Sequence, residues 1–304
     1  MLREVCDVLE VLDSPRAGGE SVSALFSGYE GVGFEWEEVT GDNGRTDVVR
    51  LRIEGAEGSA PVLALVGQLG GLGARPEMIG YVSDGDGATA ALAAALKIAR
   101  MRKLGDLLPG PVFITTHVCP DAPTQPHEPV PFMSSPITVG QGLKHMMTEK
   151  VDAVLSIDTT KGNRIINHKG IAISPPVVRG YILRVSEDLL SVYEQVAGCR
   201  PYVLPITMQD ITPYGNGITH MNSIMQPCTA VTAPVVGLAI TTEVPVAGCG
   251  TGASHEIDIE IAARYCVEVA KVFGRGNCSF YDSEELARLV KLYGSMETLV
   301  GLKP

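Results

Sequence analysis

The fold is decided by residues 82–121, which read VSDGDGATAALAAALKIARMRKLGDLLPGPVFITTHVCPD. An acidic, glycine-rich turn at 83–87 comes before an alanine-rich segment that is typical of a helix. The apolar run 111–116 then predicts a buried strand that ends at His117. Carboxylates before a helix and an imidazole at the end of a strand are how α/β hydrolytic enzymes hold metal ions. This stretch therefore favours a metal-dependent hydrolase.

Helices and strands alternate on both sides of this stretch. We expect helices at 2–12, 87–103, 139–150, 187–197, 257–273 and 283–293, strands at 33–40, 46–55, 61–66, 111–116, 152–157, 202–207 and 233–240, and mostly extended chain at 171–185. The alternation predicts a three-layer α/β/α fold around a mixed, mainly parallel sheet. We expect one domain over 1–304, with a helical N-terminal segment at 1–30 and a helical C-terminal extension at 275–304.

Composition narrows the classes of partner. The net charge is −11, the aromatic content is 5% and no dense Lys/Arg cluster occurs, which argues against nucleic-acid binding. No apolar run approaches the roughly 20 residues that cross a bilayer. The seven cysteines are widely spaced without a C-x-x-C pair, which is typical of reduced cysteines in a cytoplasmic protein. We expect a small-molecule or short-peptide substrate and a homo-oligomer.

Five acidic or histidine residues are candidate metal ligands. Asp84 and Asp86 lie in the acidic turn, where the alternative role is helix capping, although two carboxylates are more than one cap needs. His117 and Asp158 follow strands, and His255 precedes the last long helix. Oxygen and nitrogen ligands without thiolate suit zinc, with manganese or cobalt as alternatives. Such an ion would lower the pKa of a bound water to roughly 7.

Candidate substrate contacts lie in polar loops that follow strands. Arg164 and Asn167 belong to the loop after strand 152–157, together with His168. His220 follows a glycine-rich loop, and Gln68 stands in another glycine-rich loop directly after strand 61–66. For the histidines, a structural role in the core or on the surface is the alternative.

Over nearly its full length the chain closely resembles the prokaryotic family labelled domain of unknown function 1177. The motifs that carry the resemblance are residues 70–77 (GGLGARPE), 82–88 (VSDGDGA), 116–123 (THVCPDAP), 156–164 (SIDTTKGNR) and 251–256 (TGASHE). Over roughly 40–275 the order of elements is similar, more distantly, to dinuclear zinc aminopeptidases and related amidohydrolases. That resemblance implies an aminopeptidase-like α/β/α fold with metals at the carboxyl edge of the sheet.

The aminopeptidase resemblance also implies roles for individual residues. It gives the bridging aspartate to Asp84, the later acid to Asp158 and the final histidine to His255. Two positions depart from the family pattern. Gln68 stands where the first metal-binding histidine would be, and His117 with Val118 stands where a pair of glutamates would be. The general base would then be one of four other acids: Asp121, Glu77, Glu243 or Glu256.

Three functions follow from these residues. The leading hypothesis is a metal-dependent, aminopeptidase-like hydrolase of a small amide or peptide-like bond. The second is a catalytically inactive relative that serves as a small-molecule binding protein or an oligomeric scaffold. The third is hydrolysis by a cysteine nucleophile, Cys119, two residues after His117.

Overall fold

The centre of the fold is a mixed sheet, seen here in a computed structural model that describes residues 1–128, 131–246 and 252–299. Its nine strands among these residues are β1 (Val32–Gly41), β2 (Gly44–Ile53), β3 (Leu63–Gly67), β4 (Val112–Val118), β7 (Ala153–Thr160), β8 (Gly170–Ile173), β9 (Val177–Val178), β10 (Tyr181–Ile182) and β11 (Val235–Thr241). The order is β1-β2-β4-β3-β7-β11-β9-β10, and β8 also pairs with β11. The four central strands β4, β3, β7 and β11 are parallel, whereas the strands at both edges pair antiparallel. Two short strands, β5 (Thr124–Gln125) and β6 (Phe132–Met133), form a separate hairpin.

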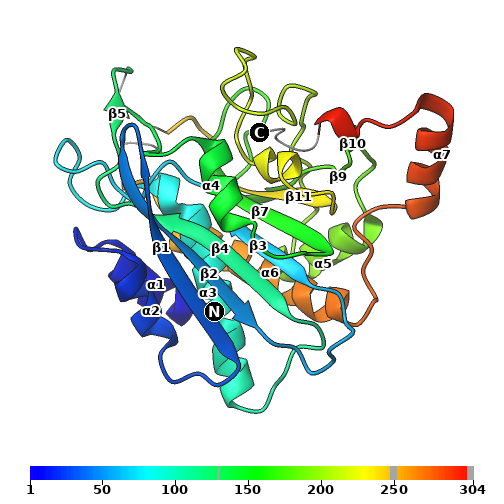
Figure 1. Ribbon diagram of the computed structural model, residues 1–304, viewed down its shortest axis with the longest axis horizontal. Helices are drawn as coiled ribbons and strands as arrows, with labels where there is room; N and C mark the ends of the chain where they lie inside the picture. Colours follow the sequence, from blue (N-terminus) through cyan, green and yellow to red (C-terminus); the bar gives the residue numbers. More distant parts are fainter. Residues whose placement is uncertain (129–130, 247–251, 300–304) are drawn as a thin grey trace.

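Helices cover the two faces of this sheet unequally. The α-helices are α1 (Leu2–Leu12), α2 (Gly19–Phe26), α3 (Asp86–Lys103), α4 (Val139–Met146), α5 (Glu187–Ala197), α6 (Glu256–Gly274) and α7 (Ser283–Tyr293), and the 3-10 turns are η1 (Ser83–Gly85), η2 (Gln226–Thr229) and η4 (Glu297–Leu299). Figure 1 shows α3 and α6 behind the central strands and α4 in front of them. No helix in the described part of the chain is both long and apolar enough to cross a membrane.

Successive side chains of the strands belong alternately to two hydrophobic cores. Leu65, Ile114 and Leu155 face the larger core, which buries α1, α2, α3, α5 and α6. Their neighbours Val66 and Val154 face the smaller core, where the cover is α4 together with loops and η2. The second outer layer is therefore thin, and much of the sheet face beneath it is covered by irregular backbone.

The expected α/β/α fold with a mixed sheet is confirmed, and one expected strand is wrong. Residues 202–207 form no strand; their one sheet-like contact among the described residues is an isolated bridge between Val203 and Ile173. Pro201 precedes this segment and Pro205 lies within it. Proline has no amide hydrogen and a fixed φ angle, so it interrupts a ladder of hydrogen bonds on both sides. The helix expected at 139–150 ends early, at Met146.

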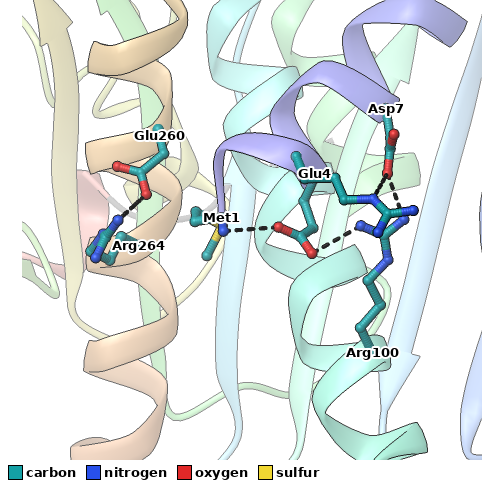
Figure 2. Close-up of polar contacts among 7 residues, drawn as sticks. Met1, Glu4, Asp7, Arg100, Glu260 and Arg264 are labelled. Atoms are coloured by element: carbon teal, nitrogen blue, oxygen red, sulfur yellow. Dashed lines mark hydrogen bonds and ion pairs between the residues drawn. The ribbon is translucent and has the colours of Figure 1, made fainter.

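An ion-pair network connects α1 to α3, two helices of the larger core. Arg100 of α3 reaches Glu4 Oε1 at 2.9 Å and Asp7 Oδ2 at 2.5 Å, so one guanidinium holds two carboxylates on successive turns of α1 (Figure 2). The Met1 amino group lies 3.0 Å from Glu4. Burial alone would raise the pKa of Glu4, but the bonds from Arg100 and from this amino group outweigh it and lower the pKa to about 2.

We expect the Glu4–Arg100 contact to stabilise the fold at neutral pH and to fail in acid. Because the folded pKa of Glu4 is depressed, its contribution is present above pH 4.5 and is lost as the pH falls from about 4.5 to about 2. Glu4→Gln should lower the free energy of unfolding at pH 7 by about 1–3 kcal/mol.

Urea unfolding at pH 7, 4 and 3 measures this effect. The difference between the wild type and Glu4→Gln should shrink steadily from pH 7 to pH 3. Glu10→Gln, an exposed change on the same helix, is the matched control and should stay within about 0.5 kcal/mol of the wild type. A constant difference between Glu4→Gln and the wild type at every pH would contradict the electrostatic explanation.

Close contact between α3 and the sheet requires glycine at position 87. A Cβ atom at Gly87 would overlap the carbonyl oxygen of Ile157 in β7 and lie 3.0 Å from the carbonyl oxygen of Gln68. Both atoms belong to backbone that is fixed in the sheet, so neither can move aside cheaply. The first turn of α3 therefore lies directly against the carboxyl ends of β3 and β7.

We expect Gly87→Ala to destabilise the protein by roughly 1–3 kcal/mol, because the methyl group overpacks rigid backbone. The matched control is Gly142→Ala in α4, where a Cβ atom would meet only Ile137 Cδ1 at an ordinary 3.5 Å. There the better helix propensity of alanine should leave stability unchanged or raise it by up to about 1 kcal/mol. Urea midpoints of both variants provide the comparison, and equal effects would refute the close-contact argument.

Candidate functional site

Three polar side chains form a row across the carboxyl edge of the parallel strands. In the sheet register Gly67 pairs with Ile157, and Val66 pairs with Thr115. The next positions therefore place Gln68 between Asp158 of β7 and His117 of β4. The Gln68 amide confirms this by donating to the Ile157 carbonyl at 2.8 Å. By strand alternation these side chains lie on the face of the smaller core.

Asp84 reaches this edge from the turn before α3. Its Oδ2 accepts hydrogen bonds from the amides of Gly70, at 2.6 Å, and Gly71, at 3.3 Å. The turn is fastened to β7 because the Thr159 hydroxyl donates to the Ser83 carbonyl at 2.8 Å. The glycine-rich loop after β3 thus acts as a cradle of amide groups for the Asp84 carboxylate.

Asp158 is a buried carboxylate beside the charge of Asp84. Its two oxygens accept hydrogen bonds from the Ser223 hydroxyl at 2.9 Å and from the Thr159 amide at 2.7 Å. Burial, followed by the negative charge of Asp84, raises the pKa of Asp158 to about 8, and the two hydrogen bonds only partly oppose this. Asp158 forms no ion pair with any described residue. Its charge lacks a counter-charge within the described chain.

Asp86 is equally buried but has a different environment. The Ser254 hydroxyl donates to its Oδ1 at 2.5 Å, and the Lys161 ammonium lies 3.6 Å from its Oδ2. Burial and the nearby Asp84 raise the pKa of Asp86 to about 7, against the lowering effects of Lys161 and Ser254. Asp84 therefore acts through its charge on both Asp86 and Asp158, and Lys161 pairs with Asp86.

His117 does not match the role of metal ligand expected from the sequence. Its Nδ1 lies 2.9 Å from the Thr46 hydroxyl and its Nε2 lies 2.9 Å from the Leu69 carbonyl oxygen. Burial lowers the pKa of His117 and favours the neutral ring. A neutral ring satisfies both contacts when Nε2 donates to Leu69 and Nδ1 accepts from Thr46. Neither ring nitrogen is then left for a metal ion.

The other expected metal ligand of histidine type lies at the surface. His255 is exposed at the N-cap of α6, and its charge acts on Asp258 in the first turn of that helix. Within the described ranges, no three His, Cys, Asp or Glu side chains are arranged to hold one metal ion together. Of the five expected ligands, the structure groups Asp84, Asp86 and Asp158.

The expected general bases and two of the substrate contacts are exposed. The exposed acids are Asp121, Glu77, Glu243 and Glu256, and the exposed substrate candidates are Arg164 and Asn167. Asp121 lines a separate cavity of about 590 Å³ between α2 and the β1–β2 hairpin. The charge of Glu243 acts on His168, which stacks on Tyr202. None of these acids is buried as Asp86 and Asp158 are.

Several buried polar atoms near the row have no hydrogen-bond partner. They are Gln68 Nε2, Ser156 Oγ, Thr160 Oγ1 and Thr241 Oγ1 on the sheet, Asp86 Oδ2 at the start of α3, and both ring nitrogens of His220 and Nδ2 of Asn222 in the loop before η2. Thr160 and Thr241 pair in register, and Thr160 lies on the same face as Asp158, two residues earlier. His220 stacks on Tyr214 at a ring distance of 4.3 Å. Unpartnered buried groups in this number are typical of a site that receives a ligand.

Sequence reasoning missed four residues of this site. Thr160 could have been found by continuing the period-two alternation from Asp158 along the strand. Lys161 follows directly, yet nothing in the sequence shows that it reaches Asp86. Thr46 and Ser223 belong to segments far away in the chain, so only tertiary structure brings them to His117 and Asp158.

The environment of the Cys119 thiol does not suit a nucleophile. Its side chain is 1% exposed, and burial raises its pKa to about 12. A nucleophilic cysteine needs the opposite, a lowered pKa and access to the substrate.

We expect iodoacetamide at pH 8 to alkylate the exposed residues Cys6 and Cys199 in the folded protein while Cys119 stays unmodified. In urea all three should react. Peptide mapping by mass spectrometry measures this, with Cys6 and Cys199 as internal controls. Labelling of folded Cys119 as fast as that of Cys199 would restore the cysteine hypothesis.

Comparison with solved structures identifies the fold. The bottromycin maturation enzyme BotP in complex with Mn has a TM-score of 0.55 at 16% identity, over 90% of this chain and 70% of BotP. A mutant of tomato leucine aminopeptidase gives 0.56 at 14% identity, over 88% and 61%. Cytosol aminopeptidase from Coxiella burnetii gives 0.52 at 13% identity, over 86% and 67%. The chain thus has an aminopeptidase-like fold and spans 61–70% of the length of these proteins.

Sequence comparison gives the family. No curated protein matches the chain. Residues 37–303 match the family described as "Protein of unknown function (DUF1177)", which includes every strand of the sheet except the start of β1. The chain therefore belongs to the DUF1177 family.

Proposed function

We propose that this protein is a metal-dependent hydrolase that acts on a small amide or peptide-like bond. The observation that carries the proposal is the pairing of Asp84 with Asp158 at the carboxyl edge of the parallel strands. Asp158 is buried and Asp84 is partly buried, and placing two such carboxylates close together is costly unless a cation offsets their repulsion. The resemblance in fold to leucine aminopeptidase, and to BotP, which was solved in complex with Mn, supports the same proposal.

The donor chemistry fits a hard divalent cation. Asp84 and Asp158 would supply carboxylate oxygens, and the amide of Gln68 lies beside Asp158 in the sheet register. An oxygen-only donor set with both histidines directed elsewhere favours Mn²⁺ or Mg²⁺ over the zinc expected from the sequence. When bound, the ion would polarise the substrate carbonyl and lower the pKa of a bound water.

The remaining steps fall to the chain's own side chains. We assign acceptance of the proton to Asp86, because its pKa of about 7 suits proton transfer at neutral pH and the four expected bases are exposed. Ser254 orients the Asp86 carboxylate through its 2.5 Å hydrogen bond. The half-buried His220 and the exposed Tyr214, whose rings stack, would flank the substrate.

A second candidate function is binding without turnover. The observation in its favour is His117, whose two ring nitrogens are held by Thr46 and Leu69 at the position where aminopeptidase relatives would carry acidic ligands. Such a protein would bind a small molecule at the same edge of the sheet. Turnover of amide substrates by the Mn²⁺-loaded protein separates the two candidates.

We expect Asp158→Asn to weaken Mn²⁺ binding at least tenfold, because it removes one of the two charges proposed to hold the ion. Isothermal titration calorimetry on chelator-treated protein measures the affinity. The matched control is Asp152→Asn at the opposite end of the same strand, where the asparagine oxygen can still accept the hydrogen bond from the Val62 amide.

Asp152→Asn should bind Mn²⁺ as the wild type does. Saturation at 100 times the dissociation constant should stabilise the wild type by about 2.7 kcal/mol, visible as a rise in its melting temperature. Wild-type protein that takes up neither Mn²⁺, Mg²⁺ nor Zn²⁺ at millimolar concentration would refute the proposal.

A further inference from the structure

A lysine, Lys161, lies among the acidic residues at the carboxyl edge of the sheet. Lys161 follows the last residue of β7, Asp86 is the first residue of α3, and Ser254 lies just before α6. The Lys161 ammonium is 3.6 Å from Asp86 Oδ2 and donates to the Ala253 carbonyl at 3.3 Å. The Lys161–Asp86 ion pair and the Lys161–Ala253 hydrogen bond thus connect the end of β7, the start of α3 and the segment before α6.

This ion pair is almost completely buried. The side chain of Asp86 is 0% exposed and that of Lys161 is 9% exposed. Removing two charges from water is costly, and only their close approach and added hydrogen bonds compensate. Ser254 supplies one such bond to Asp86, and the Ala253 carbonyl supplies one acceptor for Lys161. Lys161 is therefore held as a fixed cation and is not a mobile surface side chain.

The charge of Lys161 also acts on a second buried acid. Asp258, in the first turn of α6, is 4% exposed, and the charges of Lys169, His255, Lys161 and His168 all act on it. Lys161 thus belongs to the charge balance of two buried carboxylates. Moving it away from Asp86 would leave both with less compensation.

Asp158 and Asp86 therefore differ in how their negative charge is compensated. Asp158 receives hydrogen bonds from Ser223 and Thr159 but no ion pair from the described chain, whereas Asp86 has Lys161. A divalent ion bound to Asp86 Oδ2 would lie within a few ångströms of the ammonium, and like charges at that distance in a buried site repel strongly. Lysine and metal ion are alternatives at Asp86.

We propose that Lys161 permanently supplies the cation at Asp86, so that this protein binds one divalent metal ion, at Asp84 and Asp158, where dinuclear aminopeptidases bind two. The inference rests on the proposed function, because it fixes how many ions the proposed metal centre holds. It assigns Lys161 as a substitute for a second metal and explains why a lysine is buried at the edge of an acidic site.

The number of bound ions tests the inference directly. Chelator-treated full-length protein is titrated with Mn²⁺, and electron paramagnetic resonance measures both the free ion and the spectrum of the bound ion. We expect one Mn²⁺ per wild-type chain, with the spectrum of an isolated ion. Two Mn²⁺ per chain with an exchange-coupled spectrum would overturn the inference and leave the proposed function intact, whereas no bound Mn²⁺ would overturn the proposed function itself.

Two variants test the role of Lys161. Lys161→Met keeps the length of the side chain and removes its charge, so a second Mn²⁺ should bind and couple to the first; a stoichiometry that stays at one would overturn the inference. Lys169→Met, an exposed change on the same side of Asp258, is the matched control and should still bind one.

Asp86→Asn keeps the inference testable if Lys161→Met does not fold. It removes the carboxylate that Lys161 neutralises and nearly preserves its shape. We expect Asp86→Asn to retain one Mn²⁺ with an affinity within about threefold of the wild type. Loss of the ion, or a tenfold weaker affinity, would show that Asp86 binds metal and would overturn the inference.

Discussion

The contact of the first turn of α3 with the sheet is the constraint on which the rest of the site depends. Gly87 has no side chain, so the helix lies against the backbone carbonyls of Ile157 and Gln68. This contact brings Asp84 and Asp86, on either side of Gly85, next to the carboxyl ends of β3 and β7. The Thr159 hydroxyl and the amides of the loop after β3 then fix the orientation of the turn. A helix held farther from the sheet would move Asp84 and Asp86 away from Asp158.

Much of the fold could be predicted because it depends on local patterns. Continuous apolar runs identified the buried strands β3, β4, β7 and β11, and helical spacing identified α1, α5 and α7. The strand expected at 202–207 did not form, because Pro201 before it and Pro205 within it outweighed its apolar residues. The positions of Asp84 and Asp158 at one edge of the sheet also followed from the alternation of elements.

The partners of the site residues could not be predicted, because they depend on contacts between distant segments. His117 has the sequence context of a metal ligand, but Thr46, 71 residues earlier, takes one of its nitrogens. Ser223 reaches Asp158 from a loop 65 residues later. The pairing of Lys161 with Asp86 requires the end of β7 and the start of α3 to meet. Residue type and spacing identify candidates, whereas tertiary contacts decide which of them keep a free donor atom.

The unequal cover of the sheet has a consequence for how this family can diversify. Helices α3 and α6 pack on one face and belong to the larger core, so changes there disturb stability. The other face, which carries Gln68, Asp158 and Thr160, is covered mainly by α4 and by the loops that hold His220 and Ser223. Loops accept substitutions and changes of length more readily than packed helices. New ligand preferences could therefore arise by changes in the loops that cover the site, while its acidic residues and the larger core stay unchanged.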